Sequence, residues 1–383
     1  MGARPGLGVI SLAQNAGGVA YVGRLLRRAL ADAGRLPHVV ELGIERRDAA
    51  TAPARLRFAA RLVGMQLLHG FDWILFNHVG VARAQLMVPR RLRAPYGVFV
   101  HDIEAWAPDL DPARRRTLAE ARVVISNSAF TARKVEAAHG DVVSVVPCPL
   151  GLFEHEPIAG VRDDQLLARC GRHAVLIVGR VTSDERYKGH DELLDVWPAV
   201  CESVPDAQLF VAGWGDDIAR LRAKARDLGV GAAVEFCDYV SPATLAALFE
   251  RVAVYAMPSA REGFGLVYLE AMRAGVPCIG STLDAASEVI EHGASGYVVD
   301  RTDSRELAAA LTALLLDEER RRSMGAAGRR RYTRQFTYDR FRERLLPILI
   351  EAFPVGWGHV TSAGMEPARR EHHASSVAGS RQP

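Results

Sequence analysis

The stretch from Pro258 to Gly275 reads PSAREGFGLVYLEAMRAG. It follows a short apolar run that ends near Met257, and after a glycine-rich segment it takes on helical periodicity at about Gly265 or Leu266. A strand, a glycine-rich loop and a helix in this order leave backbone N–H groups open at the amino terminus of the helix, where an anion binds favourably. The stretch therefore predicts a strand–loop–helix unit of an α/β fold with an anion site at its turn.

Short β-branched runs alternate with amphipathic runs along the rest of the chain. The earlier expected strands are Gly8–Leu12, Val39–Leu42, Trp73–Phe76, Gly97–His101, Val123–Ser126 and Val142–Val146. The later ones are Ala174–Val178, Gln208–Ala212, Val234–Phe236, Ala253–Ala256, Pro277–Gly280 and Gly296–Val299. The expected helices between them include Tyr21–Ala33, Arg55–His69, Ala129–Ala138, Asp191–Cys201, Ile218–Leu228, Pro242–Phe249, Leu266–Ala274 and Arg305–Leu315. This alternation predicts doubly wound parallel sheets.

The length of the chain points to two domains. A chain of 383 residues suits two domains of about 150–190 residues better than one. Residues 147–165 hold three prolines and no periodicity, so we expect a linker there between a first domain, 1–155, and a second, 166–336. A terminal helix, 337–352, is expected to join the first domain, and the polar residues 354–383 are expected to form a disordered tail. Two such domains imply a cleft between facing strand ends, where ligands of these sheets bind.

The composition excludes several classes of protein. Hydrophobic residues make up 49% of the chain and charged residues 24%, which excludes a largely disordered protein. The net charge of +3 is too small for a general nucleic-acid binder, although residues 1–165 carry 21 basic against 16 acidic side chains. The five cysteines have no metal-ligand spacing, which argues against structural zinc and disulfides and for a reducing compartment.

Membrane attachment depends on two basic stretches. The sequence has neither a convincing signal peptide nor a run of the roughly 18 apolar residues that span a bilayer, so we expect a cytoplasmic protein. Arg55, Arg57 and Arg61 share an expected helix with apolar residues, and Arg320–Arg322 and Arg329–Arg331 lie on the terminal helices. Solvated helix faces are the ordinary interpretation of both stretches, and peripheral contact to anionic lipid on the inner face of a membrane is the alternative.

Two carboxylates flank the glycine-rich loop. Glu262 precedes the expected helix and Glu270 lies one to two turns into it, so both side chains can project toward the same cleft. Carboxylates accept paired hydrogen bonds from vicinal hydroxyls, and one of these two suits a sugar while the other suits a ribose. A solvated loop residue and a helix-face residue would be the ordinary interpretation. The glycine-rich context favours a binding site.

A pair of cations follows the expected strand that ends at Val178. Arg180 and Lys188 flank a loop between that strand and the next helix. Two cations at a strand end would neutralise a departing nucleoside diphosphate. Of the 48 basic residues only Lys134, Lys188 and Lys224 are lysines, so a lysine kept here favours a functional point charge over a surface residue.

The sequence EGFGLVYLEAMRAGVPCIGS, followed by Glu288 and by GASGYVV, resembles the signature region of retaining glycosyltransferases of family 4. The family motif is written E-x7-E, and Glu262 and Glu270 stand at its two glutamate positions. The resemblance covers most of the second domain and extends more loosely to the first. It implies the GT-B fold, in which two Rossmann-like doubly wound α/β domains enclose an interdomain cleft.

The resemblance also implies roles for residues of the second domain. Arg180 and Lys188 would stabilise the leaving diphosphate. The other residues would hold the donor: its sugar by Glu262 and the amides of Gly263, Phe264 and Gly265, its diphosphate by the amides of Leu266 and Val267, and its ribose by Glu270.

Fewer residues of the first domain take part in the resemblance. Gly17 and Gly18, after the first expected strand, resemble the glycine loop that approaches the donor phosphate and the acceptor. His101 ends an expected strand where the family often places a histidine that faces the donor sugar, although a structural histidine is equally common at such a place. In the second domain, Val240 resembles a position whose backbone contacts the nucleobase.

Together these features predict a retaining glycosyltransferase that acts in polysaccharide, lipid-linked glycan or glycoconjugate assembly. The expected donor is GDP-mannose or a UDP-hexose, and the expected acceptor is a hydroxyl of a glycan, a lipid-linked or a small molecule. No Asp-x-Asp metal motif occurs in a suitable donor loop, so we expect no metal, no cofactor besides the donor, and no nucleic-acid partner. Two alternatives stay open: a nucleotide-sugar epimerase of the same architecture, and a sugar-nucleotide-binding subunit without activity.

Overall fold

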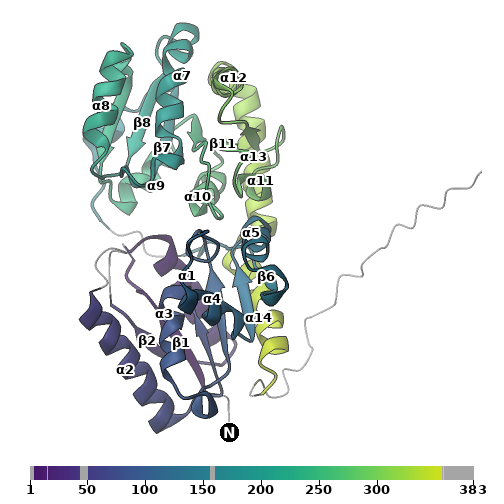
Figure 1. Ribbon diagram of the computed structural model, residues 1–383. Helices are drawn as coiled ribbons and strands as arrows, with labels where there is room; N and C mark the ends of the chain where they lie inside the picture. The colour runs from purple at the N-terminus through teal and green to yellow at the C-terminus, as the bar shows by residue number, and fades with distance from the viewer. Residues whose placement is uncertain (1–3, 15, 44–50, 156–159, 356, 358–383) are drawn as a thin grey trace, which may run out of the picture.

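The protein is described by a computed structural model that covers residues 4–14, 16–43, 51–155, 160–355 and 357 (Figure 1). These residues form two six-stranded sheets, in which paired strands run parallel. Figure 1 shows one sheet above the other, each with its own helices. The tail expected over 354–383 lies almost entirely outside the described residues. The domain bounds given above stay a prediction.

The first sheet contains the strands from the amino-terminal part of the chain. They are β1 (Pro5–Val9), β2 (His38–Glu41), β3 (Trp73–Phe76), β4 (Tyr96–Val100), β5 (Val123–Ser126) and β6 (Val145–Pro147), in the order β2-β1-β3-β4-β5-β6. The connecting elements are α1 (Gly17–Asp32), α2 (Ala52–His69), α3 (Val79–Ala82), η2 (Arg83–Met87), η3 (Arg90–Leu92), α4 (Pro112–Ala119), α5 (Ala129–His139) and η4 (Gly140–Val142). Every residue of β1, β3 and β4 is buried, as in a parallel sheet that is covered on both faces.

The second sheet repeats this plan. Its strands are β7 (Ala174–Val178), β8 (Gln208–Ala212), β9 (Val234–Asp238), β10 (Val254–Ala256), β11 (Cys278–Ser281) and β12 (Gly296–Val299), in the order β12-β11-β10-β7-β8-β9. Its helices and turns are α6 (Asp164–Arg169), η5 (Arg186–Lys188), α7 (His190–Ser203), α8 (Ile218–Asp227), η6 (Gly231–Ala233), α9 (Pro242–Phe249), α10 (Leu266–Ala274), α11 (Ala286–Val289), α12 (Ser304–Leu316) and α13 (Glu318–Gln335).

The chain returns to the first sheet through α14 (Tyr338–Ala352). At the return, the Leu152 N–H donates to the Phe336 carbonyl (2.9 Å) and the Tyr338 N–H donates to the Leu152 carbonyl (2.8 Å). The outgoing and returning segments therefore lie side by side between the sheets. Phe353, just after α14, stacks on Trp73 of β3 with ring centroids 4.9 Å apart, which fixes the last helix on the first sheet (Figure 1).

The first strand differs from the sequence prediction. A strand is predicted over Gly8–Leu12, but β1 ends at Val9. The Ile10 N–H donates to Oδ1 of Asn77 (3.1 Å) and the Leu12 N–H donates to Oε1 of Glu41 (2.8 Å). Side-chain acceptors thus take the backbone of Ile10 and Leu12 out of the sheet, and apolar periodicity does not reveal such partners.

Helix α4 has no counterpart among the predicted helices. Its sequence PARRRTLA buries only Thr117 and Leu118, too few for an amphipathic pattern. Its start is instead set by Asp111, whose carboxylate accepts from the Arg114 N–H (3.0 Å), and by Pro112 in the first turn.

Candidate active site

The loops after β7 and β10 meet because these two strands are adjacent and parallel. Arg180 follows β7, Glu262 follows β10, and Lys188 ends the turn η5 before α7. The Lys188 Nζ lies 3.8 Å from Oε2 of Glu262, and both side chains are largely buried, at 15% and 23% exposed. The structure thus brings together two side chains that are 74 positions apart in the sequence and that the sequence assigns to one site.

Glu185 joins Arg180 to the same group. Its carboxylate accepts a hydrogen bond from the Arg180 guanidinium, and its other oxygen lies 3.9 Å from the Lys188 Nζ. The Glu185 side chain is buried, at only 7% exposed, and its carboxylate contacts both cations. The Arg180 side chain remains 45% exposed. Sequence reasoning missed Glu185. The only signal was an acid three residues before the lysine.

Two glycines let these loops pack closely. A Cβ at Gly179 would lie 3.0 Å from the Cδ of Lys188, so the missing side chain leaves room for the lysine stem. Gly189 has a φ of 97°, and a Cβ there would lie 2.6 Å from the Pro258 carbonyl oxygen. The backbone after β7 therefore lies directly against the backbone after β10, which fixes the distance between Lys188 and Glu262.

Helix α10 begins beside this pair. Gly265 precedes it with a φ of 85°, and a Cβ there would lie 2.3 Å from the ring of Tyr268. No side chain caps the helix, which leaves the amides of Leu266 and Val267 at its positive end. Phe264 is 2% exposed and anchors the loop in the core. The predicted loop and helix start are therefore present, with a place for negative charge.

Asp284 is a buried carboxyl group beneath the same loop. It is 2% exposed, and its Oδ1 accepts from the Ala286 N–H at 2.8 Å. The next N–H, of Ala285, donates to the carbonyl of Glu262 at 3.0 Å. Burial, and secondarily the charge of Glu262, raises the pKa of Asp284 to about 8. Burial therefore favours the protonated, neutral form of Asp284.

On the first sheet, His101 follows β4. Its Nε2 lies 2.6 Å from the Asn77 carbonyl oxygen, so this nitrogen carries the proton. Its backbone N–H donates to Oε1 of Glu104 at 2.8 Å. Asn77 in turn donates through Nδ2 to the Val19 carbonyl at the start of α1 (3.0 Å). The strand ends after β3 and β4 are thus tied to the glycine turn that opens α1.

Gly263 is the point where the two halves of the site touch. A Cβ on Gly263 would lie 2.0 Å from the His101 carbonyl oxygen. The Gly263 carbonyl accepts from the Ser128 hydroxyl (2.6 Å) and from the Thr131 hydroxyl (3.2 Å). Asn127 donates through Nδ2 to the His101 carbonyl (3.0 Å). His101 and Gly263, predicted from separate domains, are therefore in direct backbone contact.

Glu288 forms a second bridge between the sheets. From α11 its carboxylate accepts from the Ala129 N–H (2.8 Å) and the Phe130 N–H (2.5 Å) at the start of α5. Arg133 lies 3.6 Å from the same carboxylate. A carboxylate at the positive end of a helix is stabilised both by hydrogen bonds and by the dipole. Glu288 therefore joins the donor-side loop region to α5.

The remaining predicted residues lie around this core. A Cβ on Gly18 would lie 3.7 Å from Cδ1 of Leu266, so the start of α1 faces the start of α10. Glu270 lies on α10 and is half-buried. Val240 follows β9, two strands from β7 on the same sheet edge. The roles of Glu270 and Val240 in binding a donor stay predictions.

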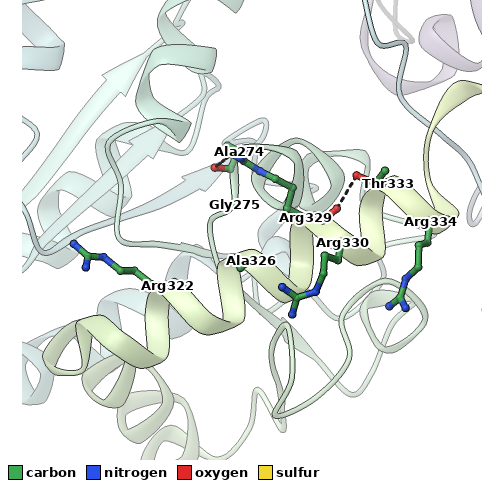
Figure 2. A pocket seen from close by; sticks show the side chains of 8 residues that line it. All are labelled: Ala274, Gly275, Arg322, Ala326, Arg329, Arg330, Thr333 and Arg334. Carbon is green, nitrogen blue, oxygen red and sulfur yellow. Dashed lines mark hydrogen bonds between the residues drawn. The ribbon is translucent and has the colours of Figure 1, made fainter.

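A separate cavity of about 670 Å³ lies along α13, at the carboxyl end of α10 (Figure 2). Arg322, Arg330 and Arg334 project along its edge, while Arg329 turns inward and donates to the carbonyls of Arg273 (3.0 Å) and Ala274 (2.8 Å). None of the predicted site residues lines this cavity. The arginine stretch Arg329–Arg331 is therefore partly structural, since Arg329 caps α10.

Within residues 4–14, 16–43, 51–155, 160–355 and 357, no group of three or more His, Cys, Asp or Glu side chains is arranged to hold a metal ion.

Residues 164–331 match the family model of glycosyl transferases group 1. This segment contains all six strands of the second sheet and both glutamates of the E-x7-E pattern.

Two relatives illustrate what the chain is similar to. A GDP-mannose-dependent alpha-(1-6)-phosphatidylinositol monomannoside mannosyltransferase of Mycobacterium tuberculosis is 32% identical over 238 residues, which are 59% of this chain and 61% of that protein. A phosphatidyl-myo-inositol mannosyltransferase of Mycobacterium leprae is 41% identical over 162 residues, 41% of this chain and 42% of that protein. The chain thus spans 61% of the length of the first relative and 42% of the second.

Solved structures share the whole architecture. Sucrose-phosphate synthase from Thermosynechococcus elongatus gives a TM-score of 0.75 at 21% identity, over 92% of this chain and 99% of that one. Anabaena HepE in complex with UDP and glucose gives 0.70 at 18% identity, over 91% and 100%. At such identities the likeness concerns the fold alone. The predicted GT-B fold, with two Rossmann-like α/β units, is confirmed.

Proposed function

We propose that this chain, whose residues 164–331 match the family model of glycosyl transferases group 1 and which has the GT-B fold, transfers a sugar from a nucleoside-diphosphate donor to an acceptor hydroxyl. The observation that carries the proposal is the pairing of Lys188 with Glu262, 3.8 Å apart, beside the uncapped start of α10. Binding of a sugar diphosphate requires positive groups for the phosphates and an acceptor for the sugar hydroxyls. Here a cation and a helix amino terminus lie beside a carboxylate that can take the second role.

Charge stabilisation is the chemical core of the proposal. When the bond between sugar and diphosphate breaks, negative charge grows on the departing phosphate oxygens. Lys188, Arg180 and the amides of Leu266 and Val267 would stabilise that charge, because they are fixed in advance by Glu185 and the helix. We propose that these groups act without a metal ion.

The other residues would position the donor. Glu262, with the amides of Gly263, Phe264 and Gly265, would hold the sugar, and Glu270 would accept from the ribose hydroxyls. His101 would face the sugar from the first sheet, since its backbone already abuts Gly263. Further contacts would come from the Gly17–Gly18 turn to the phosphate and from the backbone of Val240 to the base.

Retention at the anomeric carbon is part of the proposal. The family resemblance supports it, and Glu262 is paired with Lys188 rather than placed as an isolated nucleophile. The departing phosphate would help to deprotonate the acceptor on the same face of the sugar. The anomeric configuration of the product, measured by proton NMR coupling constants, tests this step.

The donor and acceptor classes are taken from the relatives. The Mycobacterium tuberculosis protein is named as dependent on GDP-mannose and as acting on a phosphatidylinositol mannoside. We therefore propose GDP-mannose as the donor, a UDP-hexose as second choice, and a lipid-linked acceptor.

Contact with a membrane surface is the last part of the proposal. No helix among the described residues is both long and apolar enough to cross a bilayer. Helix α2 lies on the outside of the half of the molecule that holds the first sheet (Figure 1), and it exposes Leu56 (62%), Leu67 (55%) and Leu68 (80%). Arg57 and Arg61 are exposed on the same helix. Leucines and arginines on one outer face suit a helix that lies on anionic lipid.

Substitution of the two central residues tests the proposal. Lys188→Ala and Glu262→Ala should each lower the rate of donor hydrolysis by about 10²–10³-fold, as expected for the loss of one charge-stabilising group. Lys134→Ala is the matched control, since Lys134 is exposed on α5 and should leave the rate unchanged. Near-normal rates in both site variants, with the fold intact by circular dichroism, would contradict the assignment.

A further inference from the structure

A cavity of about 700 Å³ lies beside the first sheet, enclosed by α2 and by the segments that follow β3 and β4. Its volume is within the range of about 300–1,000 Å³ typical of small-molecule sites. None of the residues assigned above to the donor lines it. The cavity therefore calls for a different ligand.

Most of the cavity wall is apolar. Phe58 from α2, Ile103 after β4 and Met87 at the end of η2 contribute large side chains, with Ala107 between them. Phe58 is 4% exposed and Met87 is 59% exposed, so the apolar wall runs from the core to the surface. A hydrocarbon chain could follow this wall outward, past the exposed Leu56 of α2.

Three arginines face the same cavity: Arg55, Arg83 and Arg114. Arg83 and Arg114 share a single carboxylate, that of Asp111, at 3.4 Å and 3.3 Å. The Nε of Arg114 is buried and has no hydrogen-bond partner among the described residues. In the same part of the chain, no carboxylate lies within 4.0 Å of Arg55. The Nε of Arg114 is the atom that lies 3.3 Å from Asp111, so Arg83 and Arg114 together face one carboxylate. The cavity therefore carries excess positive charge, which favours an anion.

The floor of the cavity adjoins the proposed site of transfer. His78 lines the cavity, and its ring stacks on that of His101 with centroids 6.3 Å apart. Glu104 also lines it, and its carboxylate already accepts from the His101 N–H and lies 4.0 Å from the His78 Nε2. The one acid at the floor is thus engaged with histidines, and it leaves the positive charge of the arginines uncancelled.

We propose that this cavity binds a phosphate-headed amphiphile, with the phosphate on Arg55, Arg83 and Arg114 and the hydrocarbon along Phe58, Ile103 and Met87. The inference rests on the proposed function, because it makes this amphiphile the acceptor and directs its free hydroxyl past His78 toward His101. It commits to a lipid phosphate, since a free phosphate would leave the apolar wall unused.

Binding of octyl phosphate below its critical micelle concentration tests the inference, with octanol and inorganic phosphate as the two half-ligands. Isothermal titration of the full chain, without donor, should give a dissociation constant for octyl phosphate at least tenfold lower than for either half-ligand. Arg55→Gln and Arg83→Gln should each weaken octyl phosphate at least fivefold. Arg57→Gln, on α2 but outside the cavity, should change it less than twofold. Ala107→Phe should abolish binding by filling the space, while GDP binding and the melting temperature stay normal.

Three results would overturn the inference: equal affinity for octyl phosphate and inorganic phosphate, equal affinity for octyl phosphate and octanol, or equal losses in Arg55→Gln and Arg57→Gln. Because the donor is absent from the titration, a failed inference leaves the donor site standing. A failed sugar transfer likewise leaves the lipid-phosphate cavity standing.

Discussion

The protonation state of Asp284 depends on its buried surroundings. It is buried beneath the loop of Glu262, with its pKa raised to about 8 mainly by burial. In the unfolded chain an ordinary aspartate loses its proton near pH 4. The native state therefore holds a proton that the unfolded state releases, and the stability of the fold falls as the pH rises toward 8.

Asp284→Asn removes this dependence. Between pH 6 and pH 8 the wild-type free energy of unfolding should fall by about 2 kcal/mol more than that of the variant. Only the wild type has a carboxyl group at position 284 that releases a proton when the chain unfolds. Urea unfolding at both pH values measures the difference. The exposed Asp109→Asn serves as control and should track the wild type. Parallel pH profiles for Asp284→Asn and the wild type would show that Asp284 is ionised in the fold.

Single residues also mark the limit of sequence reasoning. The positions of Glu262, Lys188 and the Gly265 turn could be predicted, because local sequence patterns indicate a strand end, a glycine-rich loop and a helix start. Glu185 and Asp284 could not, since their importance comes from burial and from charges brought close only by folding. His101 could be placed at a strand end, but its partner, the Asn77 carbonyl, leaves no trace in the sequence.

At the scale of elements, α5 and α11 hold the two sheets together. The α5 amides of Ala129 and Phe130 bind Glu288, while Ser128 before α5 binds the Gly263 carbonyl. Hydrogen bonds to a charged group contribute about 1.5–3 kcal/mol each. The loop that contains Gly263 therefore keeps its place against the first sheet through contacts at the start of α5.

Glu288→Ala should loosen this junction without removing the donor site. We expect donor hydrolysis to fall about tenfold, while the dissociation constant for GDP changes less than threefold, because the residues proposed to bind the donor remain. Glu291→Ala is the matched control, since Glu291 lies just beyond α11, is 58% exposed and, among the described residues, forms an ion pair only with Arg331, at 3.7 Å. Equal rates for Glu288→Ala and Glu291→Ala would contradict a role for the bridge.

The elements themselves were largely predictable. Buried strands such as β3 and β7 were predicted with the bounds that the structure shows, because their uninterrupted apolar runs are short and flanked by turns. β1 was misplaced and α4 was missed, since side-chain acceptors and a capping aspartate set their ends rather than periodicity.

At the scale of the whole molecule, two GT-B sheets face each other and the chain crosses between them twice, at Leu152 and at Phe336. This arrangement accounts for the site's composition. In the proposed function, the second sheet would supply cations and a helix start for a diphosphate, and the first would supply His101 and an arginine-lined cavity for an acceptor. In this proposal, neither sheet alone would bind both the donor diphosphate and the acceptor.

The most direct test of this account is to follow GDP-mannose and UDP-glucose by phosphorus and proton NMR in the presence of the purified chain. We expect slow release of free nucleoside diphosphate together with free sugar, faster when a lipid-phosphate acceptor is added, and at least 10²-fold slower with Lys188→Ala. Recovery of an isomerised sugar still attached to its diphosphate would identify an epimerase. Binding of both nucleotides without any turnover would identify a non-catalytic subunit, and either result would contradict the account.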